Sequence, residues 1–518
     1  NTYDEQGRVT EQADALGNTM TFSYGEDATT VTDNRGNAIV YTLDDQKRNT
    51  KITYANGDVE TTAYNEDNRI ASRTDANGVT TTHTYDEKGN VLVETRGDGS
   101  TASYTYNALA LPLTATDYEG NTTSFTYDAR GNLLTMTDGE GNRTSFGYDS
   151  LSRVTAMTDA NGGTITCQYD GDSPEPSTMT DGEGNTTDYT YDEMYRLLTE
   201  TDGEGNITTH EYNGNGWETA VTTADGGTTI YEFSAAGEVR SITDPMGVIT
   251  TFAYDAMHNI VSGTDALGHT LTYAYDANYN KVSETDAKGN VTAYAFDERN
   301  RQVTTTDALG QEIRLTLDGA GNILSQTDRR GNTTNYTYDE VLGLPTSMTD
   351  REGNVTGYSY DRNGNLTEIR YPDGSSISYT YDRAGRMTSI TAQNGLITTL
   401  SYDGNGNVVQ ISDDESRIYQ YTYDHNNQLV RAEDPLGNVT RYTYDAAGNQ
   451  TRLTDANGNA TAYGYDPVGR LTEVTDALAG PGCSPYAFHG HHLTDPHAYG
   501  RSPQFYYDVL VAPLHRRE

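Results

Sequence analysis

The sequence predicts an all-β protein, in which tandem β-hairpins form one long antiparallel sheet that coils into a hollow spiral shell, a partial cage. Three observations carry this prediction. A Tyr-Asp pair, or a degenerate copy of it, returns 23 times across residues 1–476, nearly always in steps of 21 residues. Between turn signals the side chains alternate with period 2, the period of a strand. The 41 tyrosines, with many Thr and Val, also favour strands.

Each 21-residue unit contains two turn signals of the form D-x-x-G-N. Asp starts a turn because its carboxylate accepts hydrogen bonds from nearby backbone N–H groups, and Gly supplies the positive φ that a hairpin loop requires. We take the unit that begins at YDARGNLLTMTDGEGN as representative. Its repeated positions, which we interpret as structural markers, are Tyr127, Asp128, Gly131, Asn132, Thr137, Asp138, Gly141 and Asn142.

The segments between these turns are the length of ordinary strands, about six residues. In residues 122–127, Thr123, Phe125 and Tyr127 share one parity, while the three residues between and before them are Thr or Ser. A second short segment, residues 133–137, follows the first turn, and the next turn leads into the following unit. Each unit is therefore expected to be a β-hairpin, and the series gives about 46 strands.

A sheet of this length is expected to coil. Strands lie about 4.8 Å apart, so 46 of them would extend about 220 Å, whereas open twisted sheets rarely exceed about 10 strands. The predicted geometry is either one closed turn about 70 Å across or narrower turns stacked edge to edge. Ladders of Tyr and Phe along the sheet are expected to replace the aliphatic core.

Composition excludes several classes of function. Only 34% of the residues are apolar, and the formal net charge is -42. Nucleic acid and anionic membrane surfaces are therefore not expected as partners, because both bind through Lys and Arg. No stretch approaches the ~20 apolar residues of a membrane span. Cys167 and Cys483 are too few for a disulfide scaffold, and we expect two unpaired thiols.

Residues 477–518 are expected to form an irregular tail outside the repeats, such as a truncated or frame-shifted gene end would leave. Here His489, His491, His492 and His497 cluster, which suits either a transition-metal site or the remnant of a His-dependent nuclease toxin. The spacing matches no metal motif, and the segment is too short for an active-site domain. We therefore predict no metal site and no cofactor.

Other signals in the repeats also have a structural interpretation. The acidic turns DGEGN at residues 138–142, 181–185 and 202–206 could bind Ca²⁺, but they lack EF-hand spacing and fit hairpin turns with solvated acids. The Tyr-Asp pairs resemble acid/base machinery, yet a catalytic group does not need 23 copies. We expect a protein that is not an enzyme, and we assign no role to Trp217.

The repeated segments YDARGNLLTMTDGEGN, YDRNGNLTEIRYPDGS and YDAAGNQTRLTDANGN resemble the YD repeats of RHS proteins. This family includes bacterial Rhs and wall-associated polymorphic toxins, the C component of Tc toxins, and animal teneurins. The resemblance covers residues 1–476 and implies a spiralling β shell. In the toxin members it implies a shell that encloses a C-terminal effector, released by self-cleavage of a closing segment. That closing segment is not found after residue 476.

Two functions follow as expectations. The first is the non-catalytic shell of a secreted bacterial polymorphic toxin, which encapsulates or delivers a C-terminal toxin or effector polypeptide. The second is a cell-surface protein that binds glycans on the outer wall of the same shell. Either function places the protein in the secreted or cell-surface fraction.

Overall fold

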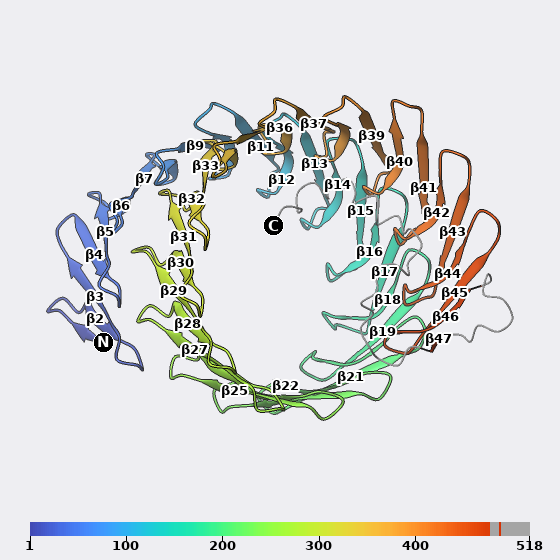
Figure 1. Cartoon of the computed structure of the whole chain (residues 1–518), viewed down its shortest axis with the longest axis horizontal. Coiled ribbons are helices and arrows are strands. Elements are labelled where there is room, and N and C mark those ends of the chain that lie inside the picture. Colours follow the sequence, from blue (N-terminus) through green and yellow to red (C-terminus); the bar gives the residue numbers. More distant parts are fainter. Residues whose placement is uncertain (477–485, 488–518) are drawn as a thin grey trace.

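The computed structural model describes residues 1–476 and 486–487, and these residues contain strands and turns but no helix (Figure 1). All 47 strands belong to one sheet. Each strand from β2 to β46 pairs antiparallel with the strand before it and the strand after it in the chain, as β13, β14 and β15 do. The predicted fold class is therefore confirmed: a meander of hairpins that coils into a spiral shell.

The first strand of each unit has six residues and ends at the Tyr-Asp position, except for the two-residue β1. These strands are β1 (Thr2–Tyr3), β3 (Thr19–Tyr24), β5 (Ala38–Leu43), β7 (Val59–Tyr64), β9 (Thr80–Tyr85), β11 (Thr101–Tyr106), β13 (Thr122–Tyr127), β15 (Arg143–Tyr148), β17 (Thr164–Tyr169), β19 (Thr186–Tyr191), β21 (Ile207–Tyr212), β23 (Thr228–Phe233), β25 (Ile249–Tyr254), β27 (Thr270–Tyr275), β29 (Val291–Phe296), β31 (Glu312–Leu317), β33 (Thr333–Tyr338), β35 (Val355–Tyr360), β37 (Ser376–Tyr381), β39 (Ile397–Tyr402), β41 (Ile418–Tyr423), β43 (Val439–Tyr444) and β45 (Ala460–Tyr465).

The second strand of each unit is shorter, usually five residues, and ends at the Thr-Asp position. These strands are β2 (Val9–Ala13), β4 (Ala28–Thr32), β6 (Asn49–Thr53), β8 (Ile70–Thr74), β10 (Val91–Thr95), β12 (Pro112–Thr116), β14 (Leu133–Thr137), β16 (Val154–Thr158), β18 (Pro176–Thr180), β20 (Leu197–Thr201), β22 (Glu218–Thr222), β24 (Val239–Thr243), β26 (Ile260–Thr264), β28 (Lys281–Thr285), β30 (Gln302–Thr306), β32 (Ile323–Thr327), β34 (Pro345–Thr349), β36 (Leu366–Arg370), β38 (Met387–Thr391), β40 (Val408–Asp413), β42 (Leu429–Glu433), β44 (Gln450–Thr454) and β46 (Leu471–Asp476). The short β47 (Tyr486–Ala487) pairs with β46.

Both turns of a unit have the same internal construction. The backbone N–H of Asp128 donates to the carbonyl of Asn132, and the N–H of Gly131 donates to the carbonyl of Asp128. One carboxylate oxygen of Asp128 accepts from the backbone N–H of Arg130 at 2.8 Å and of Asn132 at 2.9 Å, while the other accepts from the Asn132 side chain at 2.8 Å. Gly131 has φ 94°, which favours glycine. The D-x-x-G-N signal is thus a self-contained hairpin loop.

The recurring Tyr of the Tyr-Asp pair hydrogen-bonds through its hydroxyl to the unit before it. In fifteen units this hydroxyl donates to the backbone carbonyl 15 residues earlier, at the start of the previous second strand; an example is Tyr381 to Leu366 at 2.7 Å. The other tyrosines are Tyr24, Tyr64, Tyr85, Tyr106, Tyr169, Tyr191, Tyr254, Tyr275, Tyr338, Tyr360, Tyr402, Tyr423, Tyr444 and Tyr465. The hydroxyl explains why the position favours Tyr over Phe.

A β-bulge accompanies most Tyr-Asp turns. In the pairing of β13 with β14, Thr126 lies opposite Thr135 and Tyr127 lies opposite Leu133, so Leu134 is the extra residue. Bulges increase the local right-handed twist of a sheet. The hairpin of β3 and β4 has no bulge, and its unit is the one with the short 19-residue step. Repetition of the bulge in almost every unit supplies the curvature that coils the sheet.

The sheet coils into two stacked windings. The turn that follows β4 contacts the turn that follows β27, and the turn that follows β20 contacts the turn that follows β43, so one winding takes 23 strands. Strands about 4.8 Å apart then give a diameter of about 35 Å. The narrower, stacked geometry is the one observed. Figure 1 shows the ring, with β13–β20 of the first winding inside β39–β46 of the second.

The hydroxyl of the recurring Tyr is expected to stabilise the sheet locally. Tyr381→Phe should lower the free energy of unfolding by about 1 kcal/mol, the usual net value of a lost hydrogen bond. The change is measured as a shift in the urea midpoint. Tyr127→Phe is the matched control, because the Tyr127 hydroxyl forms no hydrogen bond with any described residue. Equal shifts in the two variants would show that the hydroxyl contact contributes nothing specific.

Candidate functional site

The feature that turns the sheet into a shell is the contact between its two windings, which we call the seam. All turns of one kind lie along one edge of the sheet, so each winding has a Tyr-Asp rim and a Thr-Asp rim. At the seam, the Thr-Asp rim of the first winding contacts the Tyr-Asp rim of the second. The contacts begin at Asp14 with Tyr279 and continue to Asp225 with Arg470. The seam therefore extends along the whole overlap of the windings.

Glutamates in the first winding form one recurrent seam contact. Each is the third residue of a Thr-Asp turn, and its carboxylate accepts a hydrogen bond from the backbone N–H of the second residue of a Tyr-Asp turn. The pairs are Glu119 with Arg362 (2.7 Å), Glu140 with Arg383 (2.8 Å), Glu183 with His425 (2.7 Å) and Glu204 with Ala446 (2.8 Å). Charge-assisted bonds of this kind are about twice as strong as neutral ones.

Asparagines of the second winding form a second recurrent contact in the opposite direction. Each donates its side-chain N–H to the Asp that starts a Thr-Asp turn of the first winding. The pairs are Asn278 with Asp33 (2.6 Å), Asn363 with Asp117 (2.8 Å), Asn405 with Asp159 (2.7 Å) and Asn426 with Asp181 (2.6 Å). The same aspartates also hold their own turns together, so seam formation and turn formation support each other.

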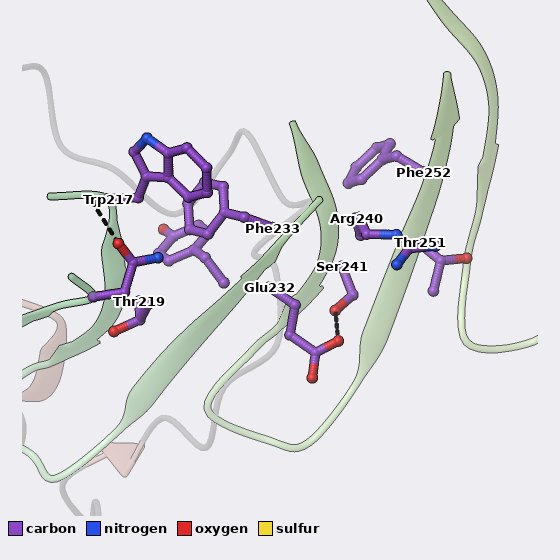
Figure 2. Close-up of a pocket in the computed structure, with 10 residues that line it drawn as sticks. Trp217, Thr219, Glu232, Phe233, Arg240, Ser241, Thr251 and Phe252 are labelled. Carbon is purple, nitrogen blue, oxygen red and sulfur yellow. Dashed lines mark hydrogen bonds between the residues drawn. The ribbon is translucent and has the colours of Figure 1, made fainter. Parts of the chain in front are cut away.

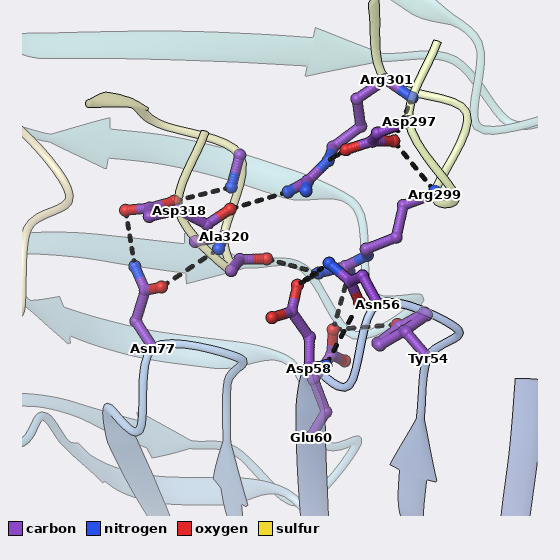
Figure 3. A network of polar contacts seen from close by, with 12 residues as sticks. Tyr54, Asn56, Asp58, Glu60, Asn77, Asp297, Arg299, Arg301, Asp318 and Ala320 are labelled. Atoms are coloured by element: carbon purple, nitrogen blue, oxygen red, sulfur yellow. Dashed lines mark hydrogen bonds and ion pairs between the residues drawn. The ribbon is translucent and has the colours of Figure 1, made fainter. Parts of the chain in front are cut away.

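Arg299 is the most buried of the cations that form ion pairs across the seam among the described residues, with 16% of its side chain exposed. Figure 3 shows it with Tyr54, Asp58 and Glu60. It reaches from the second winding to Asp58 at 3.0 Å and Glu60 at 3.3 Å in the first. Its guanidinium lies 3.7 Å from the centre of the Tyr54 ring and donates to the carbonyl of Gly319. Burial, together with the hydrogen bond to Glu60, raises the pKa of Tyr54.

The acidic DGEGN turns, for which sequence suggested Ca²⁺ sites or solvated hairpins, have a different role. Their glutamates are three of the four seam acceptors, so these acids are not simply solvated. Their second residue is Gly because the other winding approaches closely: a Cβ at Gly139 would lie 2.7 Å from the Arg383 carbonyl, and one at Gly182 2.6 Å from that of His425. Across the described residues, no three His, Cys, Asp or Glu side chains are placed to hold a metal.

The marker positions in the representative unit belong to turns and strand ends. Tyr127 ends β13 and Thr137 ends β14. Asp138 accepts from the backbone N–H groups of Glu140 and Asn142, both at 2.9 Å, and Gly141 has φ 89°. Hydrogen bonds to the Asp128 carboxylate lower its pKa, and the bond from the backbone N–H of Asn132 has the largest effect. The structure thus brings the markers together within each turn and not into one common site.

Trp217, to which sequence gave no role, takes a position that Arg occupies in other units. Arg153, for example, ion-pairs with Asp149 and lies over the Tyr169 ring, 4.4 Å from its centre. Trp217 instead packs on Phe233 with ring centres 5.3 Å apart. A cavity of about 640 Å³ lies beside this pair, with Arg240 and the Glu232–Ser241 hydrogen bond among its walls (Figure 2). The Trp217 ring therefore has a structural role, which is to pack on Phe233.

The remaining sequence expectations concern the thiols, the tail and membranes. Cys167 is a free, half-buried thiol, and burial raises its pKa. Cys483 and the histidine cluster at residues 489–497 lie outside the described residues, and the boundary at residue 476 stays a prediction. In the part of the chain that is described, no helix has the length and hydropathy needed to cross a membrane.

The architecture defines a class of protein, a non-globular shell built from tandem hairpins. The RHS Repeat family model matches residues 64–101, 106–143, 127–164, 169–207, 196–228, 233–264, 258–291, 280–312, 341–376, 360–395, 381–418, 423–460 and 448–480. The chain therefore belongs to the RHS repeat family, as the resemblance implied. No curated protein matches the chain.

Several solved structures share this fold. The chain is similar to a TcdB2–TccC3–Cdc42 crystal structure, with a TM-score of 0.65 and 15% identity over 88% of this chain and 30% of that one. TcdB2–TccC3 without its hypervariable C-terminal region gives 0.64 and 16% over 90% and 30%. A Photorhabdus luminescens Tc holotoxin pore with a TccC3 mutation gives 0.62 and 16% over 91% and 30%. The chain thus spans about 30% of the length of the chains it matches.

Loss of the Arg299 contacts is expected to weaken the seam. Arg299→Met leaves Asp58 and Glu60 without their cation, and the lost hydrogen bonds to charged groups should cost about 1.5–3 kcal/mol. The measurement is the rate of proteolysis at the turn of residues 54–58, together with the urea midpoint. Arg130→Met is the matched control, because Arg130 has the same turn position in the first winding, while its guanidinium donates to the carbonyls of Asp149 and Ser150 in the same winding and bonds no described residue across the seam. Equal effects in both variants would contradict a seam role for Arg299.

The seam is also expected to respond to acid through Asp14. A hydrogen bond from the Tyr279 hydroxyl, across the seam, is the main cause that lowers the pKa of Asp14 from 3.8 to about 2. Because the folded pKa is depressed, this carboxylate stabilises the seam above about pH 4, and the contribution is lost as the pH falls through 2.

Removing that hydroxyl tests the assignment. In Tyr279→Phe the pKa of Asp14 should rise toward 3.8, as measured by carboxyl ¹³C NMR titration of Asp-labelled protein. Tyr195→Phe is the control, since Tyr195 has the equivalent turn position in the first winding, with φ 59° against 65° for Tyr279. An unchanged titration in Tyr279→Phe would show that the depression has another origin.

Proposed function

We propose that the chain is the non-catalytic shell of a secreted bacterial toxin system and that it encloses a C-terminal effector polypeptide until delivery. The observation that carries the proposal is the seam, because polar contacts at successive turns join two windings into a continuous wall. A scaffold without a spatial role would not need its edges joined. The fold shared with Tc toxin components supports the same function.

The construction of the wall also favours a spatial role over a chemical one. Its Asp and Tyr side chains are used in turn closure, in bonds between units and in the seam. No observation on the described residues favours the alternative of glycan binding, and we do not propose it. The function implies an effector partner and a site of action outside the producing cell.

Protease protection tests the enclosure. A tagged polypeptide of about 100 residues is attached after Glu518, and its cleavage by proteinase K is compared with that of the same polypeptide attached before Asn1 and of the free polypeptide. We expect the C-terminal cargo to be cut at least tenfold more slowly than the free one, and Arg299→Met to reduce this protection. Cleavage of the C-terminal cargo at the rate of the free polypeptide would refute enclosure.

A further inference from the structure

Three arginines lie together on one face of the sheet, in the middle of neighbouring strands of the second winding (Figure 1). They are Arg431 on β42, Arg441 on β43 and Arg452 on β44. Arg431 is directly opposite Arg441, and Arg441 is opposite Thr454, so Arg452 is the diagonal neighbour of Arg441. In a sheet, the Cβ atoms of opposite residues lie about 5 Å apart and those of diagonal neighbours about 7 Å apart. We call these three residues the arginine cluster.

The arginine cluster departs from the chemistry of the rest of this face. Its positions are the third residues of their strands, and elsewhere these are mostly small or uncharged, as with Ser124 and Thr135, or Gln410 and Gln420. The chain has only 34 Lys and Arg against 76 Asp and Glu, so three arginines on successive strands are not expected from composition. Like charges directly opposite each other destabilise a sheet. The cluster therefore has no evident structural benefit.

Most of the charge of the arginine cluster is not neutralised by described residues. Arg431 forms an ion pair with Glu433, and 33% of its side chain is exposed. Arg441 and Arg452 are both exposed, and neither forms an ion pair with a residue that the structure describes. Three arginines with one carboxylate leave two positive charges without a partner. Arginine binds phosphate and carboxylate through paired, parallel hydrogen bonds, so these charges indicate an anion site.

The arginine cluster lies on a well-packed part of the sheet and not on a rim. Each of its three strands pairs with described strands on both sides. Tyr442, which follows Arg441 in β43, points to the opposite face and is only 8% exposed. The Arg452 side chain donates to the Thr454 hydroxyl at 3.3 Å. The backbone beneath the cluster is thus held in place on both sides and from below.

The surroundings of the arginine cluster limit the size of its ligand. The cluster covers three strands, which is about 10 Å across. Glu433 lies within it, Glu473 lies on the same face two strands beyond β44, and the chain as a whole has a net charge of -42. Charges further away than about 8 Å are largely screened at physiological ionic strength. A small anion is therefore attracted by the arginines, whereas an extended polyanion also meets the acids around them.

We propose that the arginine cluster binds a compact anion with two or three phosphate groups, free or esterified. A phosphate group carries up to about two negative charges at neutral pH, so a ligand of this class neutralises the cluster. Several phosphate groups also allow more than one guanidinium to bind at the same time. This binding activity goes beyond the proposed shell function and does not depend on the enclosure of an effector.

Calorimetric titration with inorganic tripolyphosphate tests the proposal, at about 50 and about 300 mM salt and without divalent cations. We expect one tripolyphosphate to bind per chain, and added salt to weaken the complex. Inorganic sulfate, which has a single anionic centre, should bind at least tenfold more weakly. A single-stranded oligonucleotide of about 30 residues, as an extended polyanion, should also bind at least tenfold more weakly.

Two double variants then locate the site. Arg441→Gln with Arg452→Gln should weaken tripolyphosphate binding at least tenfold, and glutamine already holds the equivalent positions in β40 and β41. Arg314→Gln with Arg370→Gln is the matched control, because both arginines are exposed on the same face outside the cluster and the net charge changes equally. The control should leave binding unchanged. Circular dichroism and gel filtration of both variants verify that the sheet is intact.

Each outcome decides the proposal independently of protease protection. Absence of tripolyphosphate binding, or equal weakening by the two double variants, would overturn the arginine cluster as an anion site. Binding of sulfate or of the oligonucleotide as tight as that of tripolyphosphate would overturn the assigned ligand class. If the cluster variant folds but loses tripolyphosphate while the control keeps it, and the other two anions bind weakly, the inference is supported.

Discussion

The structure depends on one constraint: the edges of a coiled hairpin sheet are rows of turns, and the windings can join only through them. Strands satisfy their own backbone groups within the sheet, so the rims offer just turn backbone and the side chains of turn residues. Glu119, Glu140, Glu183 and Glu204 use the exposed N–H groups of the opposite turns, and Asn278, Asn363, Asn405 and Asn426 use the aspartates. Both kinds of contact join a Thr-Asp turn of the first winding to a Tyr-Asp turn of the second.

This arrangement explains why a winding takes an odd number of strands. All Thr-Asp turns are on one rim and all Tyr-Asp turns are on the other, so stacked windings always present unlike rims to each other. A turn after an even-numbered strand must align with a turn after an odd-numbered strand, as after β4 and β27. Eleven and a half units per winding satisfy this condition, and a whole number of units would place turns opposite gaps.

Most of the fold could be predicted from the sequence because the 21-residue period encodes it locally. The Asp carboxylate, the Gly with positive φ and the strand alternation all act within one unit, and the Tyr381 hydroxyl bonds to Leu366 in the unit just before it. The number of strands per winding could not be predicted in this way. It follows from small increments of twist at bulges such as Leu134, summed over 23 strands. Two stacked windings were therefore one of two predicted geometries.

The seam was missed for a related reason. The DGEGN turns look like variants of one local motif, and nothing within a unit shows that Glu140 or Gly139 faces another winding. The available signal was a comparison between the halves of the chain: Glu takes the third Thr-Asp position in four turns before residue 210 and in two after it, whereas a large apolar residue takes it once before (Leu16) and four times after (Met246, Leu267, Leu309 and Leu436). Repeats that were equivalent in their contacts would not diverge in this way.

Divergence among repeats is thus the most informative property of such a chain once its fold is known. A position that closes a turn is the same in both windings, because every turn must close. A position that faces the other winding can differ between windings, because among the described residues only one of them has a neighbour on that side.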